Sequence, residues 1–365
     1  MQKIMFIISS LGIGGVEKIV INILKNLDEN KFSPTLVLLA SDTTLQGELP
    51  DNISIIKLGI EGHFATLRLI LPLARIIQRE KPQTIVSFMW GINLIVLLTK
   101  FFICSSVKII LSERIHLGKD IPNYKFSFLR RFLVKKFYPQ SGAIIAISSG
   151  IKQNLIDEFG IPEEKIRVIH NGIDLGNIET LAKALFQPTF KEYIIAVGRL
   201  EKQKNYSLLL KVFAKVNKKH DIGLVILGEG KERKNLKILI RELGLDGKVL
   251  MPGVVDNPYS WLAHGKVFVL CSKYEGFGNV IIEAMACKIP VVATNCPSGP
   301  GEIINDGVTG LLVENNNVEK LEVAILKFLN NPSLVKEISE KAFAEVKQWD
   351  IKQVTKDYET VIQSI

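Results

Sequence analysis

Residues 266–283 read Lys-Val-Phe-Val-Leu-Cys-Ser-Lys-Tyr-Glu-Gly-Phe-Gly-Asn-Val-Ile-Ile-Glu. The run 266–270, which is apolar after Lys266, has the length and composition of a buried strand. Glycines follow it in a turn, and a helix is predicted over 279–287. A strand, a glycine turn and a helix in this order make one unit of a parallel sheet that is covered by helices.

The same unit recurs along the second half of the chain, where short runs rich in Ile and Val alternate with amphipathic segments of helix length. The predicted strands are 193–198, 222–227, 248–250, 266–270, 290–293 and 310–313. The predicted helices are 205–219, 230–243, 279–287 and 317–330. This alternation predicts a doubly wound parallel sheet.

An equivalent series fills the first half, with predicted strands at 3–9, 34–40, 53–58, 84–88, 107–112, 142–147 and 166–169. We therefore predict an α/β protein with two Rossmann-like doubly wound domains. The first covers 1–175, a linker without strand pattern covers 176–191, and the second covers 192–349. The last helix, 350–365, is expected to pack back on the first domain. We expect the two sheets to face each other across a cleft between the domains. Ligands bind at the carboxyl ends of parallel strands, so loops from both sheets would line this cleft.

Length and composition agree with two folded domains, because 365 residues exceed what one hydrophobic core usually supports. Apolar residues make up 47% and charged residues 23%, which excludes a disordered chain. Cys104, Cys271, Cys287 and Cys296 lack metal-ligand spacing, so neither a disulfide framework nor a zinc site is predicted. No signal peptide or membrane span is predicted, and the reducing cytosol is the expected compartment.

The net charge of +9 is concentrated in residues 60–140, which hold 13 Lys and Arg against four Asp and Glu, an excess of 13 − 4 = +9. A solvated basic face, an anionic membrane surface and nucleic acid are the possible explanations.

Two carboxylates in the opening stretch carry the most specific chemistry. Glu275 follows a predicted strand, and Glu283 lies eight residues on, inside the next helix. Between them, the N–H groups of Gly278, Asn279 and Val280 open that helix. A loop carboxylate for sugar hydroxyls, a helix N-terminus for phosphate and a helix carboxylate for ribose hydroxyls suit a sugar nucleotide. The alternative is a pair of surface acids beside a packing turn.

Further strand-end loops offer groups for a diphosphate. The loop Ala196-Val-Gly-Arg199-Leu-Glu-Lys-Gln-Lys204-Asn205 contains a guanidinium and an ammonium. The turns Leu11-Gly-Ile-Gly-Gly-Val-Glu17 and Leu227-Gly-Glu-Gly230 each precede a helix, and either is also compatible with a simple packing turn. No Asp-x-Asp pair occurs, so the usual sequence cue for a metal-bound diphosphate is absent.

Several of these segments resemble the retaining glycosyltransferases of family 4, whose two facing Rossmann-like sheets form the GT-B architecture. The motifs are Gly14-Gly15-Val-Glu17, His170-Asn-Gly-Ile-Asp174, Gly198-Arg-Leu-x-x-x-Lys204-Asn205, Leu227-Gly-Glu-Gly230, Glu275–Glu283, Glu302-Ile-Ile and Gly307-x-x-Gly310-Leu-Leu-Val. They span nearly the whole chain in the order of the family.

The resemblance implies a role for each matched residue. Arg199 and Lys204 would hold the donor diphosphate, together with the N–H of Gly15. Glu275 and the loop Phe277 to Val280 (with Gly278 and Asn279) would position the transferred sugar and its phosphate, and Glu283 would accept the ribose hydroxyls. Catalysis would retain the anomeric configuration, with no metal and no cofactor beyond the nucleotide-sugar co-substrate.

The acceptor side differs from many family members, which carry a histidine close after the strand that here ends in Ser112-Glu-Arg114. His116 follows two residues later and is a catalytic candidate, although a lone histidine is more often structural. Arg114 and His116 are therefore candidates for the acceptor side.

Asp256-Asn-Pro-Tyr259, the run from Asn171 and Met285-Ala-Cys287 are similar, more narrowly, to bacterial N-acetylgalactosaminyltransferases that extend undecaprenyl-diphosphate-linked glycans. This resemblance implies GalNAc or GlcNAc from UDP as the donor sugar, and a lipid-linked or surface-polysaccharide acceptor.

The basic segment gains a use in this context. If 125–137 is helical, Lys125, Arg131, Lys135 and Lys136 share one side with Phe128 and Phe132. Such a face suits an anionic membrane surface, so we expect a peripheral protein on the cytoplasmic face of the inner membrane and no nucleic-acid partner. The rival functions are a UDP-sugar epimerase of the same architecture and a sugar-nucleotide binding protein without turnover.

Overall fold

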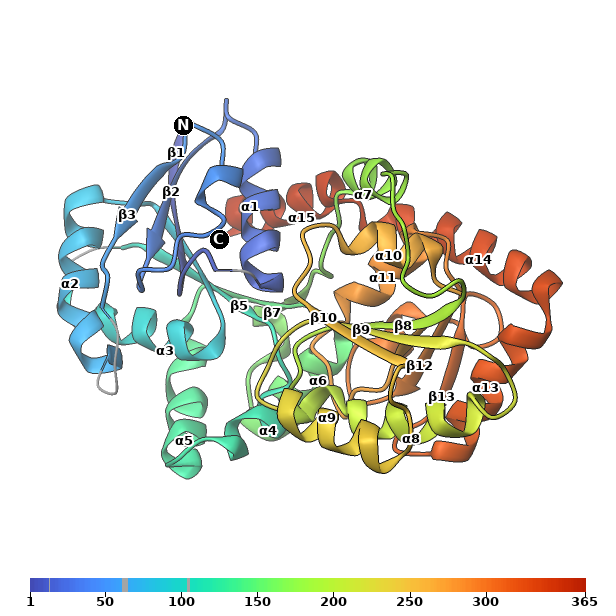
Figure 1. The fold of residues 1–365 in the computed structure, drawn as a ribbon. Helices are drawn as coiled ribbons and strands as arrows, with labels where there is room; N and C mark the ends of the chain where they lie inside the picture. Colours follow the sequence, from blue (N-terminus) through green and yellow to red (C-terminus); the bar gives the residue numbers. More distant parts are fainter. Residues whose placement is uncertain (13, 61–64, 104–105) are drawn as a thin grey trace. The chain divides into compact units, whose positions relative to one another are not determined.

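The structure, a computed structural model, describes residues 1–12, 14–60, 65–103 and 106–365 (Figure 1). The chain divides into two compact units. The first consists of Met1–Gly172 and Ile351–Ile365, and the second is Ile173–Asp350. Each unit is built around its own parallel sheet.

The first unit has a seven-stranded sheet in the order β3-β2-β1-β4-β5-β6-β7. Its strands are β1 (Gln2–Ile8), β2 (Phe32–Leu38), β3 (Ser54–Lys57), β4 (Thr84–Phe88), β5 (Lys108–Glu113), β6 (Ala143–Ala146) and β7 (Ile166–Val168). Every residue of β4 is buried, because helices cover both faces of a parallel sheet. Strand order reverses between β1 and β4.

The helices of the first unit come from both ends of the chain. They are α1 (Gly15–Asn26), α2 (Ala65–Glu80), α3 (Trp90–Thr99), α4 (Leu117–Asp120), α5 (Ser127–Phe137), α6 (Ser149–Phe159) and α15 (Ile351–Ser364). Short 3-10 turns connect several of them, including η2 (Lys100–Phe102), which directly follows α3.

The C-terminal helix α15 lies against α1, although more than 300 residues separate them in the sequence (Figure 1). Its buried residues recur every three or four positions and form one apolar face that joins the core of the first unit. Tyr358 stacks on Phe88 at 6.5 Å between ring centroids. Glu359 accepts a hydrogen bond from the backbone N–H of Asp28 at 2.8 Å. Both apolar and polar contacts therefore hold the last helix on this unit.

The second unit has a six-stranded sheet in the order β10-β9-β8-β11-β12-β13. Its strands are β8 (Tyr193–Val197), β9 (Gly223–Leu227), β10 (Val249–Gly253), β11 (Val267–Leu270), β12 (Val291–Asn295) and β13 (Leu311–Glu314). Its helices are α7 (Leu175–Ala182), α8 (Tyr206–Val216), α9 (Arg233–Glu242), α10 (Pro258–His264), α11 (Asn279–Ala286), α12 (Pro300–Ile303), α13 (Val318–Asn330) and α14 (Pro332–Val346). The 3-10 turn η6 (Lys202–Lys204) lies between β8 and α8.

The predicted fold class is confirmed, since each half of the chain forms a parallel Rossmann-like sheet and every predicted strand is present with small shifts at its ends. The predicted helices of the second domain omitted α10, α12 and α14. Both α10 and α14 begin with Asn-Pro, a favourable start for a helix, and the side chain of Asn257 accepts from the backbone N–H of Tyr259 and Ser260.

The segment predicted as a linker, 176–191, contains most of α7, which packs against α10 and α11. The side chain of Asp174 caps this helix by accepting from the N–H of Asn177 at 3.0 Å. Among the described residues, no helix has the length and the apolar sequence needed to cross a membrane.

Candidate functional site

The loops that follow β8 and β11 lie side by side, because these strands are neighbours in the second sheet. Strand order reverses between them, with β9 and β10 on one side and β12 and β13 on the other. Ligands of open α/β sheets bind outside the carboxyl ends of the strands at such a reversal. The topology therefore brings the predicted basic loop and the predicted acidic loop to the favoured place for a ligand.

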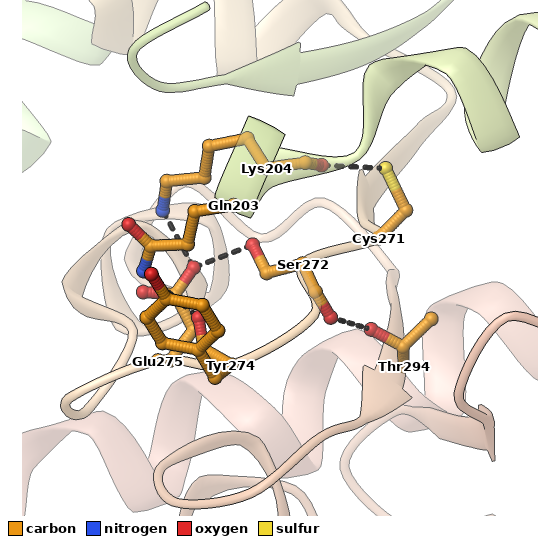
Figure 2. Close-up of polar contacts among 7 residues, drawn as sticks. All are labelled: Gln203, Lys204, Cys271, Ser272, Tyr274, Glu275 and Thr294. Carbon is orange, nitrogen blue, oxygen red and sulfur yellow. Dashed lines mark hydrogen bonds and ion pairs between the residues drawn. The ribbon is translucent and has the colours of Figure 1, made fainter. Parts of the chain in front are cut away.

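Lys204 and Glu275 form an ion pair across this reversal, with 2.6 Å between Nζ and Oε1 (Figure 2). Their side chains are only 14% and 8% exposed. Because little solvent screens the pair, removing one partner would leave a charge largely buried and uncompensated. Two residues singled out from the sequence on separate strand-end loops are thus in direct contact.

Two hydroxyl groups hold the carboxylate in place. Ser272 Oγ donates to the same Glu275 Oε1 at 2.5 Å, and Thr294 Oγ1 donates to the backbone oxygen of Ser272 at 2.8 Å (Figure 2). Both hydroxyl-bearing residues are fully buried. Within the described part of the chain, the other carboxylate oxygen, Oε2, accepts no hydrogen bond, so it has acceptor capacity for a ligand hydroxyl.

Backbone contacts tie the two loops together on either side of the ion pair. Gln203 Nε2 donates to the backbone oxygen of Tyr274 at 2.8 Å (Figure 2). The backbone N–H of Lys273 donates to the backbone oxygen of Gln203 at 2.8 Å. The Cys271 thiol donates to the backbone oxygen of Lys204 at 3.2 Å. Hydrogen bonds between the two loops therefore hold the ammonium and the carboxylate in place.

The N-terminus of α11 follows directly from the acidic loop. Gly278 precedes this helix with φ +102°, a conformation that favours glycine, and Asn279 and Val280 begin it half-buried. The first N–H groups of a helix have no partner within the helix and carry partial positive charge. Glu283 is half-buried in the second turn. Phe277 is buried, and a side chain at Gly299 would collide with its backbone oxygen.

The glycines after β9 allow its loop to approach the backbone of the loop after β8 closely. A side chain at Gly228 would collide with the backbone oxygen of Gly198, and one at Gly230 with that of Leu200. Arg199, between these two contact points, is exposed and makes no ion pair with any described residue. The loop after β8 therefore offers one exposed guanidinium beside one largely buried ammonium.

The predicted residues of the first unit occupy different strand ends. Gly15 is the first residue of α1 and is exposed. His116 is half-buried after β5, its Nδ1 has no hydrogen-bond partner among the described residues, and burial lowers its pKa.

Glu113 and Arg114, at the end of β5, belong to a buried polar network that the sequence did not reveal. Tyr138 donates to Glu113 Oε2 at 2.7 Å, and the backbone N–H of Arg114 donates to Oε1 at 3.1 Å. Burial raises the pKa of Glu113 to about 7, and these hydrogen bonds only partly oppose that effect. Arg114 Nη1 donates to Tyr358 at 3.2 Å and to Ser112 at 3.3 Å. The guanidinium thus connects β5 to the C-terminal helix.

The basic face predicted on 125–137 is only partly present. Lys125 precedes α5, which begins at Ser127. Arg131 is partly exposed: its side chain is 34% exposed, pairs with Glu158 at 2.9 Å and lies 4.8 Å from the ring centre of Phe159. Lys135 and Lys136 are exposed.

The three described cysteines form no disulfide. Cys271, Cys287 and Cys296 are free and buried, and burial raises the pKa of each to about 12. Cys104 lies outside the described residues. No group of three or more metal-ligating side chains occurs within the described ranges.

Known proteins match the chain along its whole length. The family model "Glycosyltransferase Family 4" matches residues 13–177, and "Glycosyl transferases group 1" matches residues 177–345. A Campylobacter jejuni protein is 32% identical over 98% of both chains. It is N-acetylgalactosamine-N,N'-diacetylbacillosaminyl-diphospho-undecaprenol 4-alpha-N-acetylgalactosaminyltransferase. The lipopolysaccharide core biosynthesis glycosyltransferase LpsE of Rhizobium meliloti is 27% identical over 96% of both chains.

A solved structure shares the fold. Anabaena HepE in complex with UDP and glucose superposes with a TM-score of 0.83 over 100% of both chains, at 21% identity. Together with the paired family models and the full-length relative at 32% identity, this shows that the chain is a GT-B glycosyltransferase of family 4.

Proposed function

We propose that this glycosyltransferase moves a hexose or an N-acetylhexosamine, with GalNAc or GlcNAc from UDP as the favoured sugars, to a lipid-linked or surface-polysaccharide glycan with retention of anomeric configuration. The buried Lys204–Glu275 pair at the strand reversal of the second sheet is the observation that carries the proposal. The Campylobacter jejuni relative is named for GalNAc transfer to an undecaprenol-linked acceptor, which supports this donor and acceptor class.

In this proposal the donor diphosphate lies over the loop after β8. Lys204 has three N–H donors, so it can keep its bond to Glu275 and still donate to a phosphate oxygen. The exposed Arg199 adds a planar guanidinium that can bind two phosphate oxygens. The first N–H groups of α11 provide further positive potential, and Gly15 is the corresponding candidate in the first unit.

In this proposal the two carboxylates bind the transferred sugar and the ribose. Glu275 Oε2 accepts from hydroxyls of the transferred sugar while Ser272 and Lys204 hold Oε1. Phe277 to Val280 line the sugar and its phosphate, and Glu283, one turn further along α11, accepts from the ribose hydroxyls. A single strand–loop–helix segment would thus contact both ends of the donor.

The chemical step exchanges one bond at the anomeric carbon. The bond from C1 to the phosphate oxygen breaks, and the acceptor oxygen bonds to C1 on the same face. The acceptor proton passes to the leaving phosphate oxygen, and UDP departs. Lys204, Arg199 and the helix N-terminus stabilise the negative charge that develops on UDP, and such stabilisation is often the largest contribution to catalysis. We expect turnover to continue in excess EDTA, and its abolition there would refute metal independence.

In this proposal the acceptor side belongs to the first unit, where His116 is the candidate for a contact to the acceptor, while the buried Arg114 is held by Tyr358 and Ser112. The exposed Lys135 and Lys136, with Arg131 beside them, suit the phosphates of a lipid-linked acceptor or an anionic membrane. The protein would then work as a peripheral protein on the cytoplasmic face of the inner membrane, and nucleic acid is not its partner.

A donor and acceptor screen tests the proposal. Purified protein is incubated with UDP-GalNAc, UDP-GlcNAc, UDP-glucose and UDP-galactose, each with and without extracted lipid-linked glycans, and products are analysed by mass spectrometry and NMR. We expect an α-linked product with one donor class, only when acceptor is present. Epimerised UDP-sugar without acceptor would instead identify an epimerase, and UDP-sugar binding without product from any acceptor would identify a binding protein.

A further inference from the structure

Tyr206, the first residue of α8, has a buried hydroxyl that makes no hydrogen bond with any described residue. The residue directly follows Lys204-Asn205 at the end of the loop after β8, and it is only 4% exposed. Buried polar atoms normally have a hydrogen-bond partner, because an unpaired one destabilises the folded state. Phenylalanine would fill the same space without that penalty. Packing alone therefore does not account for the hydroxyl, which lies next to the proposed donor site.

The hydroxyl lies beside the end of the Lys204 side chain. A Cβ atom added to Gly198 would lie 3.0 Å from the Tyr206 hydroxyl oxygen and 3.1 Å from Lys204 Cε. Both atoms therefore border the same small space, which stays open because Gly198 has no side chain. Lys204 Nζ is one bond beyond Cε, so rotation of the lysine side chain can bring the ammonium toward the hydroxyl.

Other contacts fix the start of α8, so the hydroxyl stays next to Lys204. The Cys271 thiol donates to the backbone oxygens of Lys204 and Asn205, at 3.2 and 3.4 Å. Asn205, which precedes the helix, donates from Nδ2 to Asn316 Oδ1 at 2.9 Å. The backbone on the N-terminal side of Tyr206 is thus held by two other loops of the second unit.

The surroundings keep the Tyr206 hydroxyl neutral. Burial raises its pKa well above the ordinary value, and the proximity of Cys271 and Glu275 adds to this effect. A neutral phenol oxygen retains lone pairs that can accept a hydrogen bond from a cation. The group beside Lys204 is therefore a hydrogen-bond acceptor without a charge of its own.

The Lys204 ammonium has a donor available for this acceptor. It carries three N–H groups, and the Glu275 carboxylate takes one of them at 2.6 Å. In the proposed function a phosphate oxygen of the donor takes the second. An ammonium on a flexible four-carbon side chain is fixed in direction only when several of its donors are engaged. The unpaired Tyr206 oxygen is suited to engage the third.

We propose that Tyr206 is a positioning residue of the donor site, whose hydroxyl oxygen accepts the third N–H of Lys204 when a nucleoside diphosphate is bound. This deepens the proposed function, on which it rests. In the ligand-free protein the unpaired hydroxyl destabilises the fold, and the turn of the ammonium toward the diphosphate relieves this. The hydroxyl therefore contributes to donor affinity and not to the stability of the free protein.

Tyr206→Phe tests this division, because it removes only the hydroxyl. In the full chain without ligand, we expect the melting temperature to rise by about 2–4 °C. Calorimetry with UDP should show a Kd about tenfold higher than that of the unaltered protein. A purely structural tyrosine would not change these two quantities in opposite directions. Unchanged UDP affinity, or a lower melting temperature together with weaker binding, would overturn the proposal.

Tyr193→Phe is the matched control in the same unit. Tyr193 is also buried, but its hydroxyl donates to the backbone oxygen of Trp261 at 2.6 Å. Loss of that bond should lower the melting temperature and leave the UDP affinity unchanged. Weaker UDP binding by Tyr193→Phe would overturn the proposal, because any lost buried hydroxyl would then have the effect assigned to Tyr206.

A double-mutant cycle shows whether Tyr206 acts through Lys204. In a Lys204→Met background, Tyr206→Phe should no longer change the UDP affinity, because the ammonium that it positions is gone. The same tenfold loss in this background would overturn the proposal.

Lys204→Met alone separates this inference from the proposed function, and none of these measurements requires turnover. Weaker UDP binding by Lys204→Met, with unchanged binding by Tyr206→Phe, would refute only the role of Tyr206. Unchanged UDP binding by Lys204→Met would refute the proposed donor site and this inference with it.

Discussion

A buried glutamate lies at the carboxyl end of a parallel strand in each unit, but the two have different surroundings. Glu275, after β11, has the ammonium of Lys204 at 2.6 Å. Glu113, at the end of β5, has the Tyr138 hydroxyl at 2.7 Å, while the neighbouring Arg114 guanidinium bonds to Tyr358. The Glu275–Lys204 pair is charged and suits a charged ligand. The network of Glu113 and Arg114 holds the first sheet to α15.

Strand order explains the difference. β11 lies at the reversal of the second sheet, next to β8, whose loop brings Lys204. β5 is one strand removed from the reversal of the first sheet, which lies between β1 and β4. The same local pattern, an acid after an apolar strand, is thus a ligand site in one place and a structural link in another.

The largest expected effect is on turnover at Glu275. Glu275→Gln keeps the shape but removes the charge next to Lys204 and the acceptor capacity for sugar hydroxyls. We expect kcat to fall by about 10²–10³-fold with UDP affinity little changed. Steady-state kinetics and calorimetry with UDP measure the two quantities, and Glu337→Gln, in an exposed ion pair with Lys341, is the control.

Glu283→Ala should instead weaken UDP binding itself. Equal losses of UDP affinity in both variants would contradict this division of roles.

The next largest expected effect is on the free energy of unfolding at the Lys204–Glu275 pair. Lys204→Met leaves the Glu275 carboxylate buried without its cation, so we expect the free energy of unfolding to drop by about 2–3 kcal/mol. The double variant Lys204→Met/Glu275→Gln should recover part of this loss, because no uncompensated charge remains. Urea denaturation at pH 7.5 gives both values. A single variant as stable as the unaltered protein would show that the pair is not buried in solution.

At Glu113 the expected effect depends on pH. Its folded-state pKa is about 7, against 4.5 for the ordinary side chain. The folded state therefore favours the protonated form, and this contribution is complete below pH 4.5 and is lost as the pH rises to 7. Relative to Glu113→Gln, the unaltered protein should lose about 2 kcal/mol of unfolding free energy between pH 5 and pH 7.5. If the difference in unfolding free energy between the two proteins does not change over this pH range, the raised pKa of Glu113 is ruled out.

The smallest expected effect tests the link to the last helix. Tyr358→Phe removes the hydroxyl that accepts from Arg114, at a cost of about 1 kcal/mol in unfolding free energy. Hydrogen exchange should increase in α15 more than in α1. Thr360→Val, whose hydroxyl bonds only to the backbone of its own helix, is the matched control. An equal change in both variants would mean that the Arg114–Tyr358 contact contributes nothing specific.

The sequence predicted the fold well because strands buried on both faces appear in it as continuous apolar runs, such as Ile4–Ile8 of β1 and Val267–Leu270 of β11. It also placed Arg199, Lys204 and Glu275 on strand-end loops. The Lys204–Glu275 contact spans 71 residues and depends on strand order, which no local pattern specifies.

Contacts between distant segments explain what was missed. Arg114 meets Tyr358 across 244 residues, so nothing near β5 marks it as a partner of the C-terminal helix. A helical wheel contains no neighbouring helix, so it could not reveal that Arg131 pairs with Glu158 of α6. The Asn-Pro starts of α10 and α14 and the Asp174 cap of α7 were signals that the sequence did contain and that the predictions overlooked.

The central claim is that the donor binds at the strand reversal of the second sheet. Hydrogen–deuterium exchange with and without UDP tests this directly in the unaltered protein. The account predicts that UDP slows exchange in residues 198–205 and 275–283 and leaves residues 108–116 of β5 and its loop unchanged. Protection confined to the first unit, or none in 198–205 and 275–283 at saturating UDP, would contradict it.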